Sequence, residues 1–247
     1  MESTELLKKL KDDVGDKLPK HVGIIPDGNR RWARSQGLDI KMGHLNGYKT
    51  LKDILYSFFH AGIKYLTVYA LSLENARKRS KEELKYIYKI IIKAIETIMS
   101  EEIVVKEQVK FRILGRLHLL PEKVRKKVEE LHEFTKDFNE NFVNILIMYD
   151  GQAEIVDAVK TMIKNNVNPD EINRNTLKNY LYTNSFPEVD FIVRTGMEDG
   201  ARISGFCLWD ASYAEFKFRN EYWPQYSAEL LVSDLEEFIE RNRRRGK

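Results

Sequence analysis

Short apolar runs alternate with amphipathic segments along most of the chain. Five runs read as strands because they are apolar, β-branched or aromatic: 22–25, 65–71, 109–115, 142–149 and 189–194. Helical patterns follow at 44–60, from Ser80 to about Lys106, and at 121–138, 151–164 and 227–244, with a polar linker and a short helix near 168–181. This alternation predicts βαβ units: an α/β fold with a mostly parallel central sheet of about six strands, flanked by helices.

We expect a single domain over residues 1–247, with an N-terminal helix or arm at 1–17 and a basic tail at 241–247. Several helix ends carry recognisable residues: Gly62 is placed as a C-cap, and Ser80 with Glu83 has the spacing of a capping box. In open parallel sheets, ligands bind beyond the carboxyl ends of the strands. The polar and glycine residues that follow the strands therefore predict one converging site: 27–29, 72–75, 150–151 and 194–196.

Composition narrows the classes of function. The 41 basic and 38 acidic residues leave a net charge of +3, which does not favour a nucleic-acid partner. A single cysteine, Cys207, excludes an intrachain disulfide. No apolar stretch approaches the roughly 18 residues of a membrane span, and no signal peptide is visible. We expect a cytoplasmic protein, with peripheral membrane contact still open.

Four segments carry candidate chemistry. The first, DGNRRWAR, begins at Asp27, whose carboxylate suits a hard cation, and continues with arginines that match phosphate oxygens. The second, KMGHLNG, places His44 between two glycines. The third, SLENARKRSKEE, runs from Ser72 to Glu83. The fourth, RTGMEDGARIS, has two arginines around glycines and ends at Ser204. Each segment alone is equally compatible with helix caps and surface loops.

Together these segments resemble the cis-prenyltransferase family, the polyprenyl diphosphate synthases related to undecaprenyl diphosphate synthase. The matching text is HVGIIPDGNRRWAR, GHLNGYKTL, YALSLEN, KRSKEEL, VDFIVRTG, RISGFCLW, SYAEF and WP, in the family's order from about residue 18 onward. The resemblance implies a Mg²⁺-dependent, typically dimeric enzyme. Such an enzyme condenses isopentenyl diphosphate repeatedly onto an allylic diphosphate and makes a long-chain precursor of a glycosyl carrier lipid. It also implies a parallel sheet with an apolar tunnel, unlike the all-α trans-prenyl synthases.

The resemblance also assigns roles to residues. Asp27 and Asn75 match catalytic positions, and Asp27 with Glu215 matches the Mg²⁺ ligands, Glu215 acting across the dimer. The allylic diphosphate positions are Gly28, Asn29, Arg31, Trp32, His44, Ser72 and Arg79. The isopentenyl diphosphate positions are Arg194, Arg202, Ser204, Arg244 and Gly246, the last two belonging to a C-terminal R-x-G. The apolar positions of the helix after Ser80 are numerous enough to face both a core and a tunnel.

Several positions differ from the bacterial members of the family, and these differences concern which allylic diphosphate serves as the primer. Ala76 stands where those members have tryptophan, 148–152 reads MYDGQ rather than NYGGR, and the loop 194–204 is longer. These differences fit an archaeal or eukaryote-like member, which uses farnesyl diphosphate or a longer primer such as geranylgeranyl diphosphate. The alternative is a non-catalytic partner subunit of a heteromeric prenyltransferase, which the retained Asp27 and Arg194 disfavour. A phosphatase needs a nucleophile with an adjacent base, and none is evident.

Overall fold

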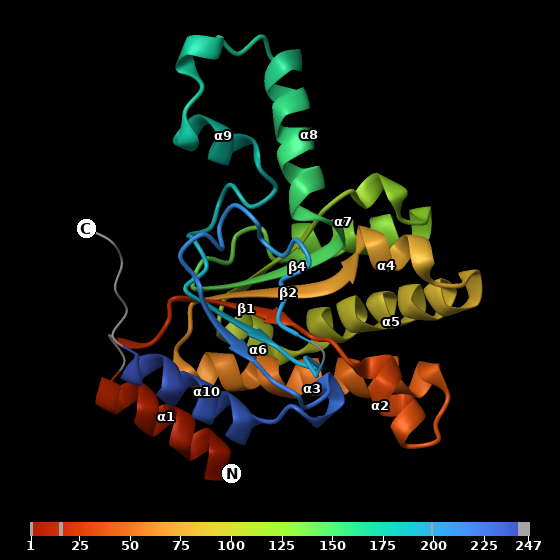
Figure 1. Ribbon diagram of the computed structural model, residues 1–247, viewed down its shortest axis with the longest axis vertical. Coiled ribbons are helices and arrows are strands. Elements are labelled where there is room, and N and C mark those ends of the chain that lie inside the picture. The colour runs from red at the N-terminus through yellow and green to blue at the C-terminus, as the bar shows by residue number, and fades with distance from the viewer. Residues whose placement is uncertain (1, 15–16, 199, 242–247) are drawn as a thin grey trace.

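The computed structural model describes residues 2–14, 17–198 and 200–241. Its centre is a six-stranded sheet in the order β3-β4-β2-β1-β5-β6, and every neighbouring pair is parallel (Figure 1). The strands are β1 His21–Ile25, β2 Tyr65–Ser72, β3 Val109–Leu114, β4 Asn141–Tyr149, β5 Phe191–Arg194 and β6 Glu215–Phe218. The predicted fold class is confirmed.

Ten α-helices within the described residues accompany the sheet. They are α1 Glu2–Val14, α2 Asn29–Ser35, α3 Ile40–Ala61, α4 Leu73–Lys78, α5 Lys81–Ser100, α6 Glu102–Lys106, α7 Glu122–Phe134, α8 Gly151–Lys164, α9 Arg174–Tyr180 and α10 Ala228–Glu240. Short 3₁₀ turns lie at Leu117–Leu119 (η2), Pro169–Glu171 (η3) and Trp223–Gln225 (η4). Helix α8 extends away from the sheet, with α9 beside it (Figure 1). No helix in the described part of the chain has the length and apolarity to cross a membrane.

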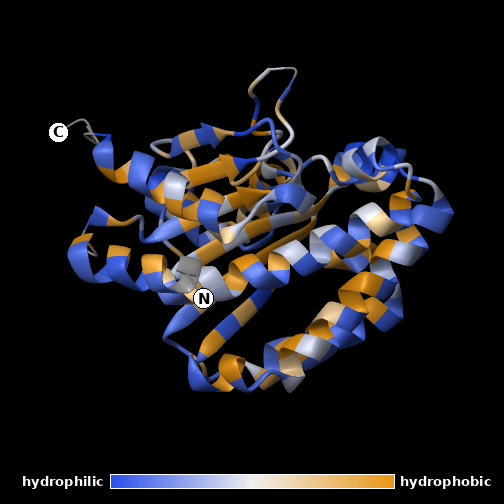
Figure 2. Ribbon diagram, turned by 90° about the horizontal axis from the view of Figure 1, so that it is seen from below, coloured by the Kyte–Doolittle hydropathy of each residue, from blue (hydrophilic) through white to orange (hydrophobic). Residues whose placement is uncertain are grey.

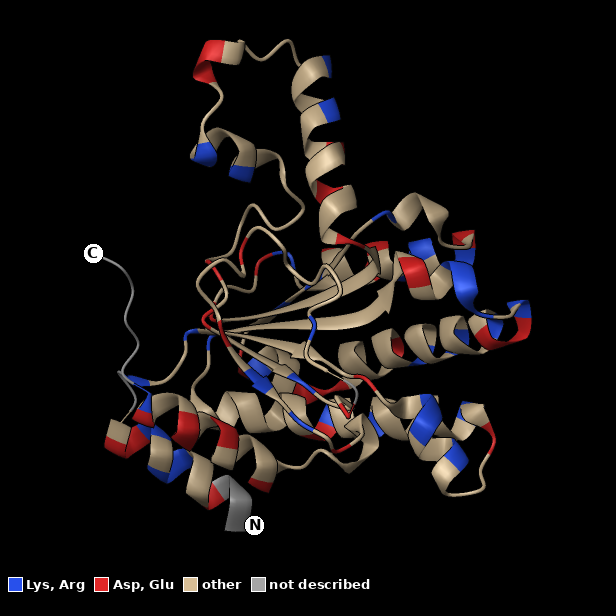
Figure 3. Cartoon of the chain, in the orientation of Figure 1, with Lys and Arg blue, Asp and Glu red and all other residues tan. Residues whose placement is uncertain are grey.

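Alternation along the strands divides the core between the two faces of the sheet. Ile24, Val68 and Val193 belong to the larger apolar cluster, which includes residues of α1, α3, α5, α7 and α10. Their neighbours Ile25 and Tyr69 belong to a second, smaller cluster with Phe206 and Cys207. Figure 2 shows apolar strands enclosed by helices, and Figure 3 shows that the central strands carry no charged side chains. The charged residues therefore lie on the helices, on the edge strands β3 and β6, and at the strand ends where the predicted site lies.

Helix α7 protects an edge of the sheet. Thr135, just after α7, accepts a hydrogen bond from the backbone N–H of Phe111 at 3.2 Å, and His132 Nε2 accepts one from Ile113 N–H at 2.8 Å. An edge strand otherwise presents unpaired backbone groups to other chains. The exposed side of β3 thus obtains its partners from within the chain.

Several predicted boundaries were wrong. The helix expected from Ser80 to Lys106 breaks at Glu101, which has an extended backbone (φ −85°, ψ 119°) between α5 and α6. His44 does not open its helix, because α3 begins at Ile40 with the Asp39 side chain accepting from Lys41 N–H. The last helix ends at Glu240 rather than at 244. The sixth strand, β6, was not among the five predicted runs, because its four residues are defined as a strand by their pairing with β5.

Candidate functional site

Asp27 lies immediately beyond the carboxyl end of β1, the strand that has β2 on one side and β5 on the other. Its Oδ2 accepts from Arg194 Nη2 at 2.9 Å, and its Oδ1 accepts from Gly28 N–H at 2.6 Å. Thr195 fixes the backbone here: its hydroxyl donates to Asp27 O at 2.8 Å and accepts from Asp27 N–H at 3.0 Å. The carboxylate is therefore held by two adjacent strand ends, yet its side chain keeps 37% of its surface exposed.

Arg194 is the most enclosed cation of the site, with 5% of its side chain exposed. Its Nη1 donates to Arg202 O at 2.7 Å and to Ser204 Oγ at 2.9 Å, so it anchors the 194–204 loop against β5. Arg31 reaches the same loop, because its Nη2 donates to Gly196 O at 2.6 Å. These contacts join the first and fourth motifs predicted from the sequence.

Glycines in the first two motifs allow neighbouring segments of the chain to pack closely against the backbone. Gly28 has φ +101°, and a Cβ there would lie 2.6 Å from Tyr222 Cδ1, so another residue would be both strained and obstructed. On α3, a Cβ at Gly47 would lie 2.4 Å from Asn29 Oδ1. Helix α2 therefore packs directly on the first turns of α3, and this places Asn29 near His44.

A second cationic group surrounds Glu83. His44 Nε2 lies 2.9 Å from Glu83 Oε1, and Arg79 Nε and Arg30 Nε lie 3.4 and 3.9 Å from the same oxygen. Burial lowers the pKa of His44, opposed by its hydrogen bond to Glu83. Burial likewise lowers the pKa of the Arg79 guanidinium from its high ordinary value. One carboxylate from α5 thus gathers guanidinium groups from α2 and from the segment between α4 and α5, together with the His44 imidazole of α3.

Both groups open on one cavity of about 560 Å³. Its polar lining residues include Asp27, Asn29, Arg30, Arg31, Arg34, His44, Ser72, Glu74, Asn75, Arg79, Arg194, Arg202 and Ser204. Its apolar lining residues include Leu51, Val68, Ile87, Ile90, Ile91, Ala94, Ile95, Ile98, Ile113, Ile145 and Ile147. The cavity therefore has a cationic mouth at the strand ends and an apolar interior between α3, α5 and the sheet.

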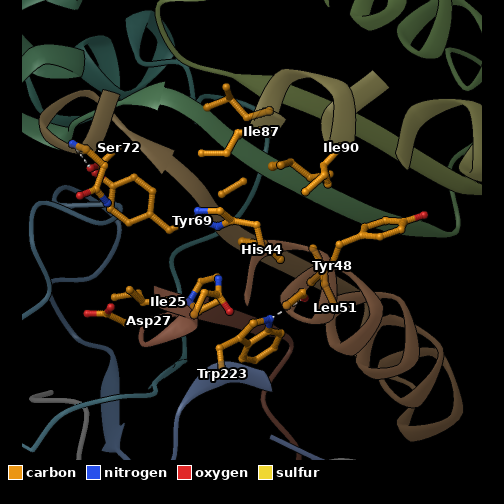
Figure 4. A pocket seen from close by; sticks show the side chains of 18 of the residues that line it. Ile25, Asp27, His44, Tyr48, Leu51, Tyr69, Ser72, Ile87, Ile90 and Trp223 are labelled. Carbon is orange, nitrogen blue, oxygen red and sulfur yellow. Dashed lines mark hydrogen bonds between the residues drawn. The ribbon is translucent and has the colours of Figure 1, made fainter. Parts of the chain in front are cut away.

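Figure 4 shows this division from close by: Asp27 and Ser72 lie on one side, while Ile87, Ile90 and Leu51 lie toward the other. Four buried side-chain atoms along the cavity have no hydrogen-bond partner within the described residues, namely Asn29 Oδ1, Arg30 Nε, Arg79 Nε and Arg194 Nε. Buried polar atoms without partners are costly in a finished structure. Three of the four are guanidinium donors, two of them ion-paired with Glu83 but without a hydrogen bond, and such donors suit an anionic ligand with several oxygens.

The sequence predicted most of this lining. Among the described candidates, all but Trp32 and Glu215 line the cavity. Glu215 begins β6 in register with Phe191 at the start of β5, so within this chain it lies at the opposite end of the strands from Asp27. Arg244 and Gly246 fall outside the described residues. Ser72 also accepts from Asn75 N–H at 3.0 Å, which caps α4 and fixes Asn75 at the mouth.

Sequence reasoning missed two kinds of contributor. Arg30 and Arg34 line the cavity and belong to the first motif, from which the sequence predicts only that their guanidinium groups suit phosphate. The contact of Glu83 with His44 was not predicted, because Glu83 was interpreted as part of a capping box. Ser80 does accept a hydrogen bond from Glu83 N–H at 3.2 Å, but the Glu83 side chain contacts His44. An acidic residue three positions after a cap is too common to signal a binding site by itself.

The donor set fits a metal shared with a substrate better than a metal held by the chain alone. Within the described ranges, no group of three or more His, Cys, Asp or Glu side chains is arranged to hold an ion. Mg²⁺ commonly takes one or two carboxylates, water and substrate phosphate oxygens. The exposed part of the Asp27 carboxylate, beside arginines that suit a diphosphate, fits that pattern.

Comparisons with known proteins agree with this arrangement. Residues 25–246 match a family described as "Putative undecaprenyl diphosphate synthase". The chain is 38% identical over 235 residues to the tritrans,polycis-undecaprenyl-diphosphate synthase (geranylgeranyl-diphosphate specific) of Methanopyrus kandleri, which covers 94% of this chain and 86% of the relative. It is 39% identical over 246 residues to the enzyme of the same name from Pyrococcus horikoshii, covering 98% and 91%.

A solved structure is also similar. The crystal structure of lavandulyl diphosphate synthase from Lavandula x intermedia, in complex with dimethylallyl diphosphate, superposes with a TM-score of 0.86 at 29% identity. The match covers 92% of this chain and 98% of the plant chain. The similarity extends over nearly the whole fold described above.

Proposed function

The chain belongs to the undecaprenyl diphosphate synthase family, whose members transfer prenyl groups, and from this premise we propose that it elongates geranylgeranyl diphosphate with isopentenyl diphosphate. Each new double bond is cis, and the product is a long-chain polyprenyl diphosphate that serves as a precursor of a glycosyl carrier lipid. The choice of primer is supported by the names of the archaeal relatives and by the departures from bacterial members at Ala76 and in the 194–204 loop. Farnesyl diphosphate is the competing primer.

One observation carries the proposal: two groups of arginines, one around Asp27 and one around Glu83, lie at the mouth of the same apolar cavity. Condensation needs two diphosphates held together, one as leaving group and one on the nucleophile. We assign the allylic diphosphate to Asn29, Arg30, Arg31, His44 and Arg79, whose donors surround the α2–α3 junction. We assign isopentenyl diphosphate to Arg194, Arg202 and Ser204, together with Arg244 and Gly246 of the tail.

The chemistry follows from this placement. The allylic C–O bond breaks, and the electron pair leaves with the diphosphate, where fixed guanidinium groups stabilise the added charge. The isopentenyl double bond attacks the allylic C1, a C–C bond forms, and a proton leaves the condensed product. Asn75, at the exposed start of α4, is positioned beside this reacting region. Asp27 would hold Mg²⁺ together with the diphosphate, and the ion would neutralise further charge on the leaving group.

A homodimer completes the proposal. Val156, Val159 and Ile163 form a row on α8 with spacings of three and four residues, and they are 48%, 44% and 69% exposed. An apolar row at helical spacing that no part of the described chain covers suits a second copy of the chain. The dimer also gives Glu215 a role, since it can reach Asp27 only in another subunit. Peripheral membrane contact during product release stays a prediction.

The test is incorporation of labelled isopentenyl diphosphate with Mg²⁺ and, in separate reactions, dimethylallyl, geranyl, farnesyl or geranylgeranyl diphosphate. Wild type is compared with Asp27→Ala and with Asp53→Ala, which removes an exposed carboxylate on α3. We expect long butanol-soluble chains from wild type and Asp53→Ala, fastest with geranylgeranyl diphosphate, and none from Asp27→Ala. Best reaction with a short primer refutes the primer assignment. No incorporation with any primer favours the partner-subunit alternative.

A further inference from the structure

A second, smaller space adjoins the apolar part of the cavity. A smaller cavity of about 70 Å³ has Ala94, Ile98 and Ile145 in its lining, and the large cavity has the same residues in its own. Tyr48 and Leu51 of α3 also line both. The two spaces are therefore adjacent, and we call them together the channel, which lies between α3 and α5 from Asp27 to the junction of α5 with α6.

The far part of this channel contains a charged pair. Lys52 Nζ of α3 donates to Glu101 Oε1 at 2.6 Å, and both residues line the smaller cavity. Their side chains are 38% and 30% exposed, so the pair lies where the channel meets the surface. Tyr56, one turn after Lys52, also lines this space and hydrogen-bonds to Glu101. These two hydrogen bonds lower the pKa of the Glu101 carboxyl and keep it ionised.

The helix break at Glu101 produces this contact. Glu101 is the extended residue between α5 and α6, at the position where the sequence predicted an unbroken helix. No glycine or proline accounts for the interruption. The carboxylate at the break connects the end of α5 to the middle of α3, the two helices that form the channel walls.

We propose that Lys52 and Glu101, supported by Tyr56, form a polar latch that closes the channel and determines product length. This inference rests on the proposed function, because it concerns the hydrocarbon that the site elongates. Most of the wall consists of apolar side chains, which a prenyl tail can contact without loss. The charged pair offers a hydrocarbon no such contact. A prenyl tail that pushed between Lys52 and Glu101 would have to separate two ions, which costs free energy.

The experiment compares product lengths at excess isopentenyl diphosphate, with the best primer, by chromatography of the dephosphorylated chains. The variants are Lys52→Ala/Glu101→Ala, which removes the latch, and Glu101→Gln, which removes its charge at constant size. The charge swap Lys52→Glu/Glu101→Lys restores an ion pair. The matched control is Glu122→Ala/Lys126→Ala, which removes an exposed pair of 2.9 Å on α7.

We expect the double alanine variant and Glu101→Gln to shift the main product upward by one or more five-carbon units. The charge swap and the control should keep the wild-type lengths, and the rate of the first condensation should be unchanged in all four. Unchanged or shorter products from both latch variants overturn the inference while leaving the proposed function intact. If wild type itself makes no product, the proposed function fails and the latch fails with it.

Discussion

Arg194 Nη2 donates to Asp27 Oδ2 at 2.9 Å, and the same guanidinium holds Ser204 Oγ through Nη1. The acid that follows β1 is thus linked to the loop that follows β5, although the two residues are 167 positions apart. In the proposed reaction Asp27 serves the allylic diphosphate and Arg194 serves isopentenyl diphosphate. Their contact keeps the two diphosphates in register, as a reaction between two bound substrates requires.

Arg194→Lys should therefore impair catalysis although it preserves the charge. Lysine is a point charge on a flexible stem and cannot hold Asp27, Arg202 O and Ser204 Oγ with one planar fork. We expect a loss in kcat of about 10²–10³-fold, the range for a lost stabilising donor, with a higher KM for isopentenyl diphosphate. Steady-state kinetics would check this, with Arg174→Lys on α9 as an exposed control. Wild-type kinetics for Arg194→Lys would contradict the bridging role.

Glu83→Ala should affect one substrate only. Without its carboxylate, His44, Arg30 and Arg79 lose their common partner and the two guanidinium groups repel each other, so the allylic diphosphate site becomes less ordered. We expect the KM for the allylic primer to rise roughly tenfold, the equivalent of one charge-assisted hydrogen bond, with an unchanged KM for isopentenyl diphosphate. Glu82→Ala, at the neighbouring exposed position, is the control. An equal rise in both KM values would show that Glu83 acts on the fold and not on this site.

The sequence allowed the strand ends to be predicted, and with them the site. Asp27, Ser72 and Arg194 each follow an apolar run, and a parallel sheet brings such positions together whatever their separation in the chain. The strand ends and the site could be predicted because they depend on the local sequence pattern and on the parallel α/β topology, which few other topologies can replace.

Other features depend on contacts that a single sequence does not display. Glu83 looked like half of a capping box, and only the packing of α5 beside α3 brings its carboxylate to His44. Glu101 lies in a stretch without glycine or proline, so the sequence gives no signal for its extended backbone, and the packing of α5 beside α3 brings its carboxylate to Lys52. Strand β6 was missed as a strand because pairing with β5, not its own composition, defines it.

Ile163→Asp should dissociate the proposed dimer. Ile163 is 69% exposed on α8, and a carboxylate there would be buried without a partner between two copies of the chain. Sedimentation velocity should show a smaller species than wild type, and prenyl transfer should fall because Glu215 no longer reaches a second site. The control is Thr161→Asp, which places the same charge at another exposed position of α8. If the Ile163 variant sediments as wild type does, this row of residues is not the dimer interface.

His21 should make stability sensitive to mild acid. Its ring is fully buried at the start of β1, and burial lowers its pKa to about 4. Nδ1 lies 2.9 Å from Pro187 O, which can only accept, so Nδ1 carries the proton and Nε2 accepts from the Thr67 hydroxyl at 2.8 Å. Thr67 in turn accepts from Asn144 Nδ2 at 3.1 Å. This chain of donors requires a neutral imidazole.

The lowered pKa of His21 determines whether acid stabilises or destabilises the fold. Above the ordinary histidine value of 6.5 both folded and unfolded states hold neutral His21, and its full contribution to stability is present. As pH falls from 6.5 toward 4, the unfolded chain takes up a proton that the folded protein refuses, so the free energy of unfolding falls by about 3 kcal/mol in all. Buried carboxyls with raised pKa, Glu154 and Asp210, act in the opposite direction, so wild type alone is not diagnostic.

Urea unfolding of wild type and His21→Asn at pH 7.5 and pH 5 isolates the effect, because the carboxyl contributions cancel in the difference. Asparagine can donate to Pro187 O and accept from Thr67 but cannot take up the proton. We expect the stability advantage of wild type to shrink by about 2 kcal/mol between the two pH values. If the asparagine variant is too unstable at pH 7.5, His21→Gln takes its place in the same comparison. Parallel pH profiles for wild type and variant would mean that His21 is protonated in the folded chain and that the donor order inferred for Thr67 is reversed.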